Sequence, residues 1–378
     1  ISSIQRITRN DFLWMDRFTI QNLELLDSNR ENGNTLLKVL DNTVSPMGSR
    51  MVKRWLMFPL QDIRKIEERF NTTEFFIKDQ DIKNSLTALI KQIGDIERIV
   101  AKIPLHKIAP REVLQLAKGL QAIAEVKEKT KNCSDAWIVR LSEQLNPCNL
   151  IKEKITQTLI ENPPALANKG GLIANGIHEE LDDLRKTSSN SKEYLLQIQQ
   201  REIELTGIPS LKISFNNVFG YYLEVTNTHK HKVPDNWIRK QTLANAERYI
   251  TPELKEYEQK IMGAEEKILV LEMQIYDALL LELQEYISPI QLNANLIAQL
   301  DCITCFANNA IQYKYRRPVV SAEYDLHIEE GRHPVIERNL PIGEDYVSNT
   351  VLLDKNEQQI IIITGPNMSG KSALLRQT

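Results

Sequence analysis

Apolar residues recur every three or four positions along much of the first 160 residues, which is the spacing of a helix with one buried face. A turn at residues 43–50 begins a helix that should end before Pro59, because the residue before a proline disfavours the helical conformation. Further apolar runs cover residues 36–40, 63–76, 82–100 and 113–126. We therefore predict that this part of the chain is mostly helical.

Two longer periodic runs follow, at residues 177–205 and 254–278, and their apolar residues alternate between spacings of four and three. We expect an antiparallel pair of helices, each about 40 Å long, with the intervening residues at its tip. Two ordinary long core helices are the alternative. The apolar positions are Ile177, Leu181, Leu184, Leu195, Ile198 and Leu205 in the first run, and Leu254, Tyr257, Ile261, Ala264, Ile268, Leu271, Ile275 and Ala278 in the second.

The residues between these two runs have the pattern of β-strands. Residues 211–215 and 221–225 alternate around a turn at 216–220, and further strand-like pieces surround Leu243 and Tyr249. We interpret the aromatic residues of this segment as the core of a small module rather than as platforms for unstacked bases, since nothing in the sequence indicates a single-stranded ligand. These residues are Phe215, Phe219, Tyr221, Tyr222, Trp237 and Tyr249.

After Tyr313 the pattern changes to short strands. They are expected at residues 318–320, 326–328, 347–353 and 360–363. This arrangement is typical of the beginning of an α/β domain.

The composition is that of ordinary globular domains. With 378 residues, 42% of them apolar and 26% charged, the chain has room for two or three domains that each bury a core. No run reaches the 18 or so apolar residues that a membrane span needs, and no signal peptide is visible. Four cysteines do not make a disulfide framework, so we expect a reducing, cytoplasmic location and no membrane partner.

Cys302 and Cys305 have the spacing of a zinc or redox pair, but they fall in a stretch, residues 292–313, that is predicted to be helical. Cys133 and Cys148 do not supply a matching second pair. We interpret Cys302 and Cys305 as small core residues.

Positive charge is concentrated in the strand-rich segment. Residues 207–250 carry six basic and three acidic side chains, a local charge of +3 in a chain whose formal net charge is −3. Such a module is suited to contact with a phosphate backbone. A solvated basic surface is the alternative, and charge alone does not decide between the two.

The last residues contain a phosphate-binding loop. Gly365, Gly370, Lys371 and Ser372 have the spacing G-x-x-x-x-G-K-[ST], after an apolar strand-like run and before a helix-forming sequence. The glycines allow backbone N–H groups to surround phosphate oxygens, Lys371 would neutralise the β- and γ-phosphates, and Ser372 would bind Mg²⁺. The loop predicts nucleotide binding.

Several ordered motifs resemble the MutS family, the bacterial DNA mismatch-recognition ATPases. They lie at residues 41–50, 94–98, 220–225, 239–250, 330–335 and 364–368, and so span nearly the whole chain. The resemblance implies a multidomain fold: a mainly α core with long antiparallel lever helices, a small β-rich clamp inserted at their tip, and the start of a P-loop α/β ATPase domain. The implied boundaries are 1–205 for the core and first lever helix, 206–252 for the clamp, 253–314 for the returning lever and core, and 315–378 for the ATPase portion.

The resemblance also implies site residues. DNA-backbone contacts are expected from Arg239, Lys240, Thr242, Asn245 and Arg248, with Lys212, Lys230 and Lys232 as weaker candidates, although each cation could instead brace the module through Glu224, Asp235 or Glu247. ATP or ADP is expected to bind Gly365, Pro366, Asn367, Met368, Ser369, Gly370, Lys371 and Ser372, with Tyr346 stacking on adenine, the Val347 backbone reading its edge, and Ser372 holding Mg²⁺. The family loop has a second glycine and a threonine where this chain has Ser369 and Ala373.

The implied function is mismatch recognition and the initiation of repair by an ATP-gated clamp that slides on duplex DNA. The partners would be double-stranded DNA with mismatches or small loops, a second copy of the protein and downstream repair proteins, in the bacterial cytoplasm near the nucleoid. The family's mismatch-wedging domain, Walker B strand and signature region have no counterpart here, so we expect a DNA-dependent ATPase in the full-length protein and no ATP hydrolysis by this chain alone. The alternatives are a family member acting in recombination, which generally lacks the clamp, a coiled-coil chromosome-organising ATPase and a metabolite kinase.

Overall fold

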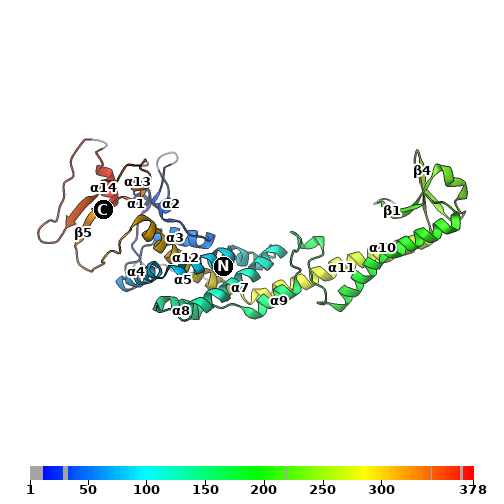
Figure 1. The fold of residues 1–378 in the computed structure, drawn as a ribbon, viewed down its shortest axis with the longest axis horizontal. Helices are drawn as coiled ribbons and strands as arrows, with labels where there is room; N and C mark the ends of the chain where they lie inside the picture. The colour runs from blue at the N-terminus through cyan, green and yellow to red at the C-terminus, as the bar shows by residue number, and fades with distance from the viewer. Residues whose placement is uncertain (1–11, 29–32, 217, 219, 342, 367–368) are drawn as a thin grey trace. The chain divides into compact units, whose positions relative to one another are not determined.

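The computed structural model describes residues 12–28, 33–216, 218, 220–341, 343–366 and 369–378. The chain divides into two compact units, and each is described by itself. The first unit contains residues 1–102, 118–152 and 286–378, and the second contains residues 103–117 and 153–285. Figure 1 colours both along the chain.

The first unit is mainly helical around a buried helix, α12 (Ile287–Tyr313), which packs against α3, α4, α5 and α6. Ile297 and Leu300 of α12 are fully buried. The other elements of this unit are α1 (Arg17–Asn22), α2 (Leu36–Leu40), α3 (Pro46–Met57), α4 (Ile63–Lys78), α5 (Gln80–Ile93), α6 (Ile96–Lys102), α8 (Ala136–Gln144), β5 (Leu326–Gly331), α13 (Pro334–Glu337), β6 (Asn349–Leu353) and α14 (Lys371–Gln377). Helices α7 (Pro110–Thr130) and α9 (Asn149–Thr158) contribute residues to both units.

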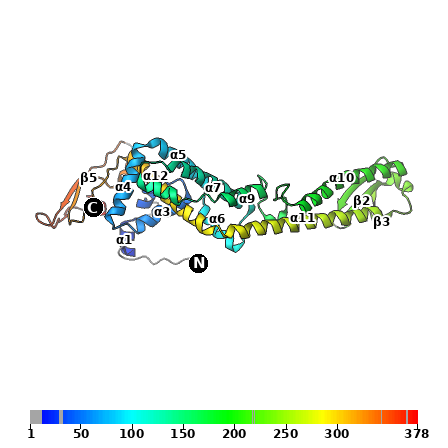
Figure 2. The same cartoon turned by 90° about the horizontal axis from the view of Figure 1, so that it is seen from below.

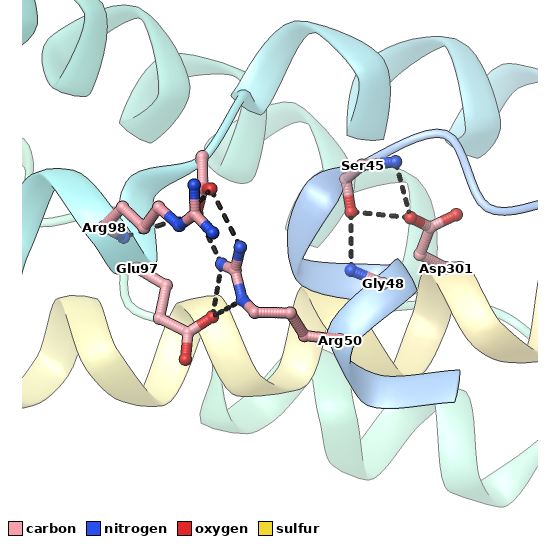
Figure 3. A network of polar contacts seen from close by, with 7 residues as sticks. Ser45, Gly48, Arg50, Glu97, Arg98 and Asp301 are labelled. Carbon is pink, nitrogen blue, oxygen red and sulfur yellow. Dashed lines mark hydrogen bonds and ion pairs between the residues drawn. The ribbon is translucent and has the colours of Figure 1, made fainter. Parts of the chain in front are cut away.

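A buried carboxylate fixes the start of α3 against α12 (Figure 3). Asp301 accepts hydrogen bonds from Val44 N at 3.1 Å, Ser45 N at 2.9 Å and Ser45 Oγ at 2.6 Å, and Ser45 Oγ in turn accepts one from Gly48 N at 3.0 Å. A Cβ atom at Gly48 would lie 2.2 Å from the Asp301 carboxylate, so this close approach requires glycine. The network explains why serine and glycine occupy positions 45 and 48.

Arg50 joins two sequence motifs that are far apart along the chain (Figure 3). Its guanidinium donates to Asp95 at 2.6 and 3.0 Å and to Glu97 at 2.6 and 3.0 Å. The hydrogen bond with Asp95 is the main reason that the pKa of Arg50 is raised. Gly94, with a φ of 73°, separates α5 from α6, so the predicted continuous run at 82–100 is two helices.

Cys302 and Cys305 lie inside α12 and are buried, as expected for core residues. The Cys302 Sγ atom is 3.5 Å from the Gly48 carbonyl oxygen, and the Cys305 Sγ atom is 3.3 Å from that of Leu40. Burial raises the pKa of the Cys305 thiol to about 11. Both thiols therefore serve as weak donors in a packed interior.

The second unit contains the paired long helices α10 (Glu179–Thr206) and α11 (Pro252–Gln284), together with two short 3-10 helices, η1 (Ile103–Leu105) and η2 (Ala167–Lys169). Arg185 contacts Glu272 near one end of the pair, and the rings of Tyr194 and Tyr257 lie 4.3 Å apart further along. This order of contacts makes the helices antiparallel, as predicted (Figure 2).

The seam between α10 and α11 departs from the predicted register at both ends. Leu205 is 73% exposed, and Ile177 lies before α10 and is 39% exposed. On α11 the buried face includes Glu272, Tyr276 and Leu283, while Ala278 is exposed. The shift accommodates the carboxylate of Glu272, which receives hydrogen bonds from Arg185 and from the backbone N–H of Gly171.

Between these helices the chain forms an antiparallel sheet of four strands in the order β1-β2-β4-β3. The strands are β1 (Lys212–Asn216), β2 (Gly220–Thr226), β3 (Ile238–Thr242) and β4 (Ala246–Ile250), with the 3-10 helix η3 (Asn227–Lys232) between β2 and β3. The sheet packs on the helix pair through a cluster that includes Ile198 of α10 and Leu254 of α11. The strand prediction for this segment is confirmed.

Two predicted strands near the C-terminal end are wrong. Residues 318–320 and 360–363 are not in strands, whereas β5 and β6 pair with each other antiparallel. A strand needs a hydrogen-bonded neighbour, and no described strand pairs with 360–363, where Ile360 is 80% and Ile362 is 83% exposed. Among the described helices, none is long and apolar enough to cross a membrane.

Candidate nucleic-acid interface and phosphate loop

One face of the four-stranded sheet carries the apolar cluster that packs on the helix pair, and the other carries a row of polar and charged residues. Leu223, Val225, Trp237 and Tyr249 are buried in the cluster shared with α10 and α11. Strand pairing places a polar row on the other face, crossing all four strands: Lys212 is opposite Glu224, Glu224 is opposite Arg248, and Arg248 is opposite Gln241. Alternation along each strand therefore separates the core from a charged ladder.

Arg248, a predicted DNA contact, is held within this ladder. Its Nε atom donates to Glu224 at 3.1 Å and its guanidinium donates to Gln241 at 2.9 Å. The guanidinium also lies 4.4 Å from the centre of the Tyr222 ring, and the side chain is only 19% exposed. The structure thus gives Arg248 a bracing position, which was the alternative considered for each cation.

Arg239 pairs in part with Glu247, a buried acid. It lies 3.4 Å from Glu247, whose carboxylate also accepts a hydrogen bond from the Tyr249 hydroxyl. That hydrogen bond is the main reason that the pKa of Glu247 is lowered, with Arg239 contributing. Burial, and then the same carboxylate, raise the pKa of Tyr249 to about 12. Arg239 nevertheless remains 61% exposed, so its guanidinium is accessible to a ligand.

Lys240 is the extra residue of a β-bulge on the edge strand. Arg239 is opposite Tyr249 and Gln241 is opposite Arg248, which leaves Lys240 without a cross-strand partner. The side chains of Lys240 and Lys212 are exposed and make no hydrogen bond or ion pair with another described residue. A bulge turns a side chain away from the regular ladder, so Lys240 is presented to solvent.

The remaining predicted contacts lie around the β3–β4 hairpin and η3. Thr242 and Asn245 are exposed at the hairpin turn, which is closed by a 2.8 Å hydrogen bond from Leu243 N to Ala246 O. Lys230 is exposed, close enough to Glu247 to help lower its pKa. Lys232 donates to the Gly207 carbonyl oxygen at 3.0 Å, where α10 ends. Lys232 thus stabilises the end of a helix, and is less available than Lys230.

The phosphate loop leads into α14 as the spacing predicts. Gly365 and Gly370 have φ angles of 148° and 91°, which favour glycine, and Lys371 is the first residue of the helix. Ser369 Oγ donates to the Pro366 carbonyl oxygen at 2.8 Å, and the Lys371 ammonium donates to the Gly365 carbonyl oxygen. Asn367 and Met368 lie outside the described residues.

Tyr346 and Val347 line the same pocket as Ser369, Gly370 and Lys371. The pocket has a volume of about 530 Å³. The Tyr346 hydroxyl is 2.9 Å from Gln377 Oε1 on α14, and Val347 is 82% exposed. The fold therefore brings together two parts of the predicted nucleotide site that are separated by more than twenty residues in sequence.

Ser372 faces a neighbouring pocket, which it shares with His333 and Arg376. Arg376 forms a 3.1 Å ion pair with Glu24 beside it. Burial, and then the charge of Arg376, lower the pKa of His333. Sequence reasoning did not identify this pocket, because Glu24 lies more than 300 residues from His333 and has no local signal.

The bracing residues of the sheet were also missed. Glu224 is expected from the sequence as a possible partner of these cations, but Gln241 and Tyr222 are not. The signal was present in the strand alternation, since residues on one face of paired strands are neighbours. The β-bulge at Lys240 was not readable from the sequence, and it determines which residues are opposite each other.

Comparison with known proteins identifies the family. The family model for MutS domain III matches residues 18–307. Proteins named DNA mismatch repair protein MutS from Parabacteroides distasonis, Phocaeicola vulgatus and Bacteroides thetaiotaomicron are 56%, 55% and 54% identical over all 378 residues. The chain covers 43%, 43% and 44% of the length of those relatives, less than half of each. The chain belongs to the MutS family.

Proposed function

We propose that a full-length protein containing this chain recognises mismatched DNA and initiates repair as an ATP-gated sliding clamp. Residues 1–205 and 253–314 would supply the core and levers, residues 206–252 the clamp, and residues 315–378 the start of the ATPase domain. The observation that carries the proposal is the small sheet with exposed cations, packed on the end of an antiparallel helix pair. The names of the relatives support the same function.

The clamp would hold DNA by its phosphates. Lys240, Lys212 and Arg239 are exposed cations on strands, and Thr242 and Asn245 are exposed hydrogen-bonding groups at the adjoining turn. Contacts of this kind carry no base sequence information and lose strength as salt rises, because counterions compete for the phosphates. Both properties suit a ring that slides. Arg248 would act indirectly, by holding the edge strand in place.

The phosphate loop would bind ATP or ADP. The positive φ angles of Gly365 and Gly370 and the helix beginning at Lys371 fit a phosphate cradle. Lys371 would give up its hydrogen bond to the Gly365 carbonyl oxygen and bind phosphate oxygens instead. Ser372 would hold Mg²⁺, and Tyr346 would stack on the base. Mg²⁺ would neutralise phosphate charge during hydrolysis.

DNA-dependent ATPase activity, a homodimer, contacts with later repair proteins and a place near the nucleoid are part of the same proposal.

The proposal is tested by DNA binding of the full-length protein at several salt concentrations. We expect tighter binding to mismatched than to matched duplex, a steep loss of affinity with salt, and release along the DNA when ATP is added. Replacing Lys240 by Ala should weaken binding to all DNA sequences. It should also reduce the slope of the logarithm of the binding constant against the logarithm of the salt concentration by about one. Lys53→Ala, an exposed lysine of α3, is the matched control. Equal and salt-insensitive binding to both duplexes would contradict the proposal.

A further inference from the structure

Arg69 on α4 is a cation without a polar partner in an apolar setting. Its guanidinium lies 3.5 Å from the centre of the Trp55 ring of α3. It makes no ion pair or side-chain hydrogen bond with any residue that the structure describes. Burial lowers the pKa of Arg69 to about 10. Placing a charge where water is partly excluded destabilises the fold unless something compensates it.

The neighbouring carboxylates of α4 are engaged elsewhere. Glu67 and Glu74 form ion pairs with Arg317, and Glu68 forms one with Arg140. Arg64, near the start of the same helix, lies 3.6 Å from Asp62 and has a side chain that is 92% exposed. Among these cations, Arg69 alone is half-buried with no acid beside it.

Arg69 lines a pocket of about 310 Å³ between α3, α4 and α12. Apart from Thr73, the other lining residues are apolar or aromatic. They include Trp55 and Phe306, whose rings are 6.0 Å apart. This volume is at the lower end for ligand pockets, about 300–1,000 Å³. It suits one large side chain better than a whole cofactor.

We propose that this pocket is a docking site for a peptide segment of a partner protein in which a large apolar side chain adjoins a carboxylate. The apolar side chain would enter between Trp55 and Phe306, and the carboxylate would form a bidentate pair with Arg69. Arginine is suited to this role because its planar group can stack on an aromatic ring while its edge donates to a carboxylate. The site is distinct from the sheet and the phosphate loop, so it does not depend on the proposed function.

Charge and polarity disfavour other occupants. Duplex DNA is held by several cations acting together, whereas Arg69 is the one charged residue among the described residues that line this pocket.

The test is fluorescence anisotropy of a labelled peptide containing Phe-Glu between Gly-Ser flanks, titrated with the chain. We expect a micromolar dissociation constant for this peptide and at least tenfold weaker binding when its Glu is replaced by Gln, since a charge-assisted pair is lost. This comparison uses the unaltered chain and does not depend on a variant folding. Lack of binding at millimolar concentration, or equal binding of the two peptides, would overturn the proposal.

Substitutions on α4 test whether the peptide binds in this pocket. Arg69→Met keeps the apolar stem and should weaken binding of the Glu peptide at least tenfold. Its melting temperature should change little, because the lost contact with the Trp55 ring is offset by the removal of a half-buried charge. Arg69→Lys should retain part of the affinity, and Arg64→Met, on the same helix, should leave it unchanged. Undiminished binding by Arg69→Met would overturn the proposal. The proposal would also be overturned if a twelve-base-pair DNA duplex displaced the peptide from the unaltered chain and this duplex binding were lost in Arg69→Met.

Discussion

Arg248 and Lys240 are both basic residues of the same small sheet, yet their surroundings give them different roles. Arg248 has two hydrogen-bond partners and an aromatic ring beneath it, while Lys240 projects from a bulge into solvent. A side chain that already satisfies its hydrogen bonds inside the fold contributes mainly to stability. One that satisfies none is available to a ligand. Residue type alone does not distinguish these cases.

We predict that Arg248→Ala lowers the free energy of unfolding of the sheet by about 1–3 kcal/mol, since it leaves Glu224 and Gln241 without their partner. Lys240→Ala should change it by less than about 0.5 kcal/mol. Urea unfolding followed by the fluorescence of Trp237 measures both, in a protein whose other tryptophans are replaced by Phe. Equal stability of the two variants would show that the ladder does not brace the sheet.

The sequence located these residues but not their partners. Motifs such as 239–250 place cations in the right segment, because side-chain chemistry is local information. Whether Arg239 faces Glu247 or a phosphate depends on strand register, and register depends on the bulge at Lys240. That feature is a property of two strands together.

At the scale of elements, the long helices were predictable because their apolar spacing continues over many turns. The contact between α10 and α11 departs from the predicted register where a polar side chain is buried in it. Glu272 is fully buried and pairs with Arg185, so the face of α11 that meets α10 rotates there. The strand expected at 360–363 is not formed. A strand needs a hydrogen-bonded neighbour, and no described strand pairs with these residues.

The helix pair should be sensitive to acid through Glu253. Hydrogen bonds from Arg201, and then from Tyr194, lower the pKa of this carboxyl group. Because the folded-state pKa is lower than the unfolded value of about 4.3, the stabilisation is complete above that value and is lost as the pH falls through the folded pKa. Glu253 is 39% exposed, so solvent screens the interaction and the effect is modest.

We therefore expect Glu253→Gln to be less stable than the unaltered chain at pH 7 and the difference to shrink as the pH falls below about 4. Urea midpoints at pH 7, 5 and 3.5, read from Trp237, measure the difference. Glu204→Gln is the control, because among the described residues the Glu204 carboxylate has only the exposed Gln200 as a partner. A difference that grows on acidification would contradict the assigned partner.

At the scale of the whole molecule, motifs far apart in sequence form common structures. Residues 41–50 meet Asp95 and Asp301, and Tyr346 meets the phosphate loop. The order of these motifs was enough to recognise the family, although the sequence could not show the network that joins them. Membership of the family predicts that the cationic sheet contacts DNA. That prediction can be tested at Lys240, which the β-bulge presents to solvent.

The most direct test is photo-cross-linking of the full-length protein to a thirty-base-pair duplex. A photoreactive phenylalanine derivative would replace Lys240 on the edge strand or, as a control, Leu281, which is 63% exposed on α11. We predict DNA adducts at position 240 with matched and mismatched duplexes, with a yield that falls as salt rises from 50 to 200 mM, and few adducts at position 281. Adducts at position 281 without any at position 240 would contradict the assignment of the sheet as the DNA-contacting clamp.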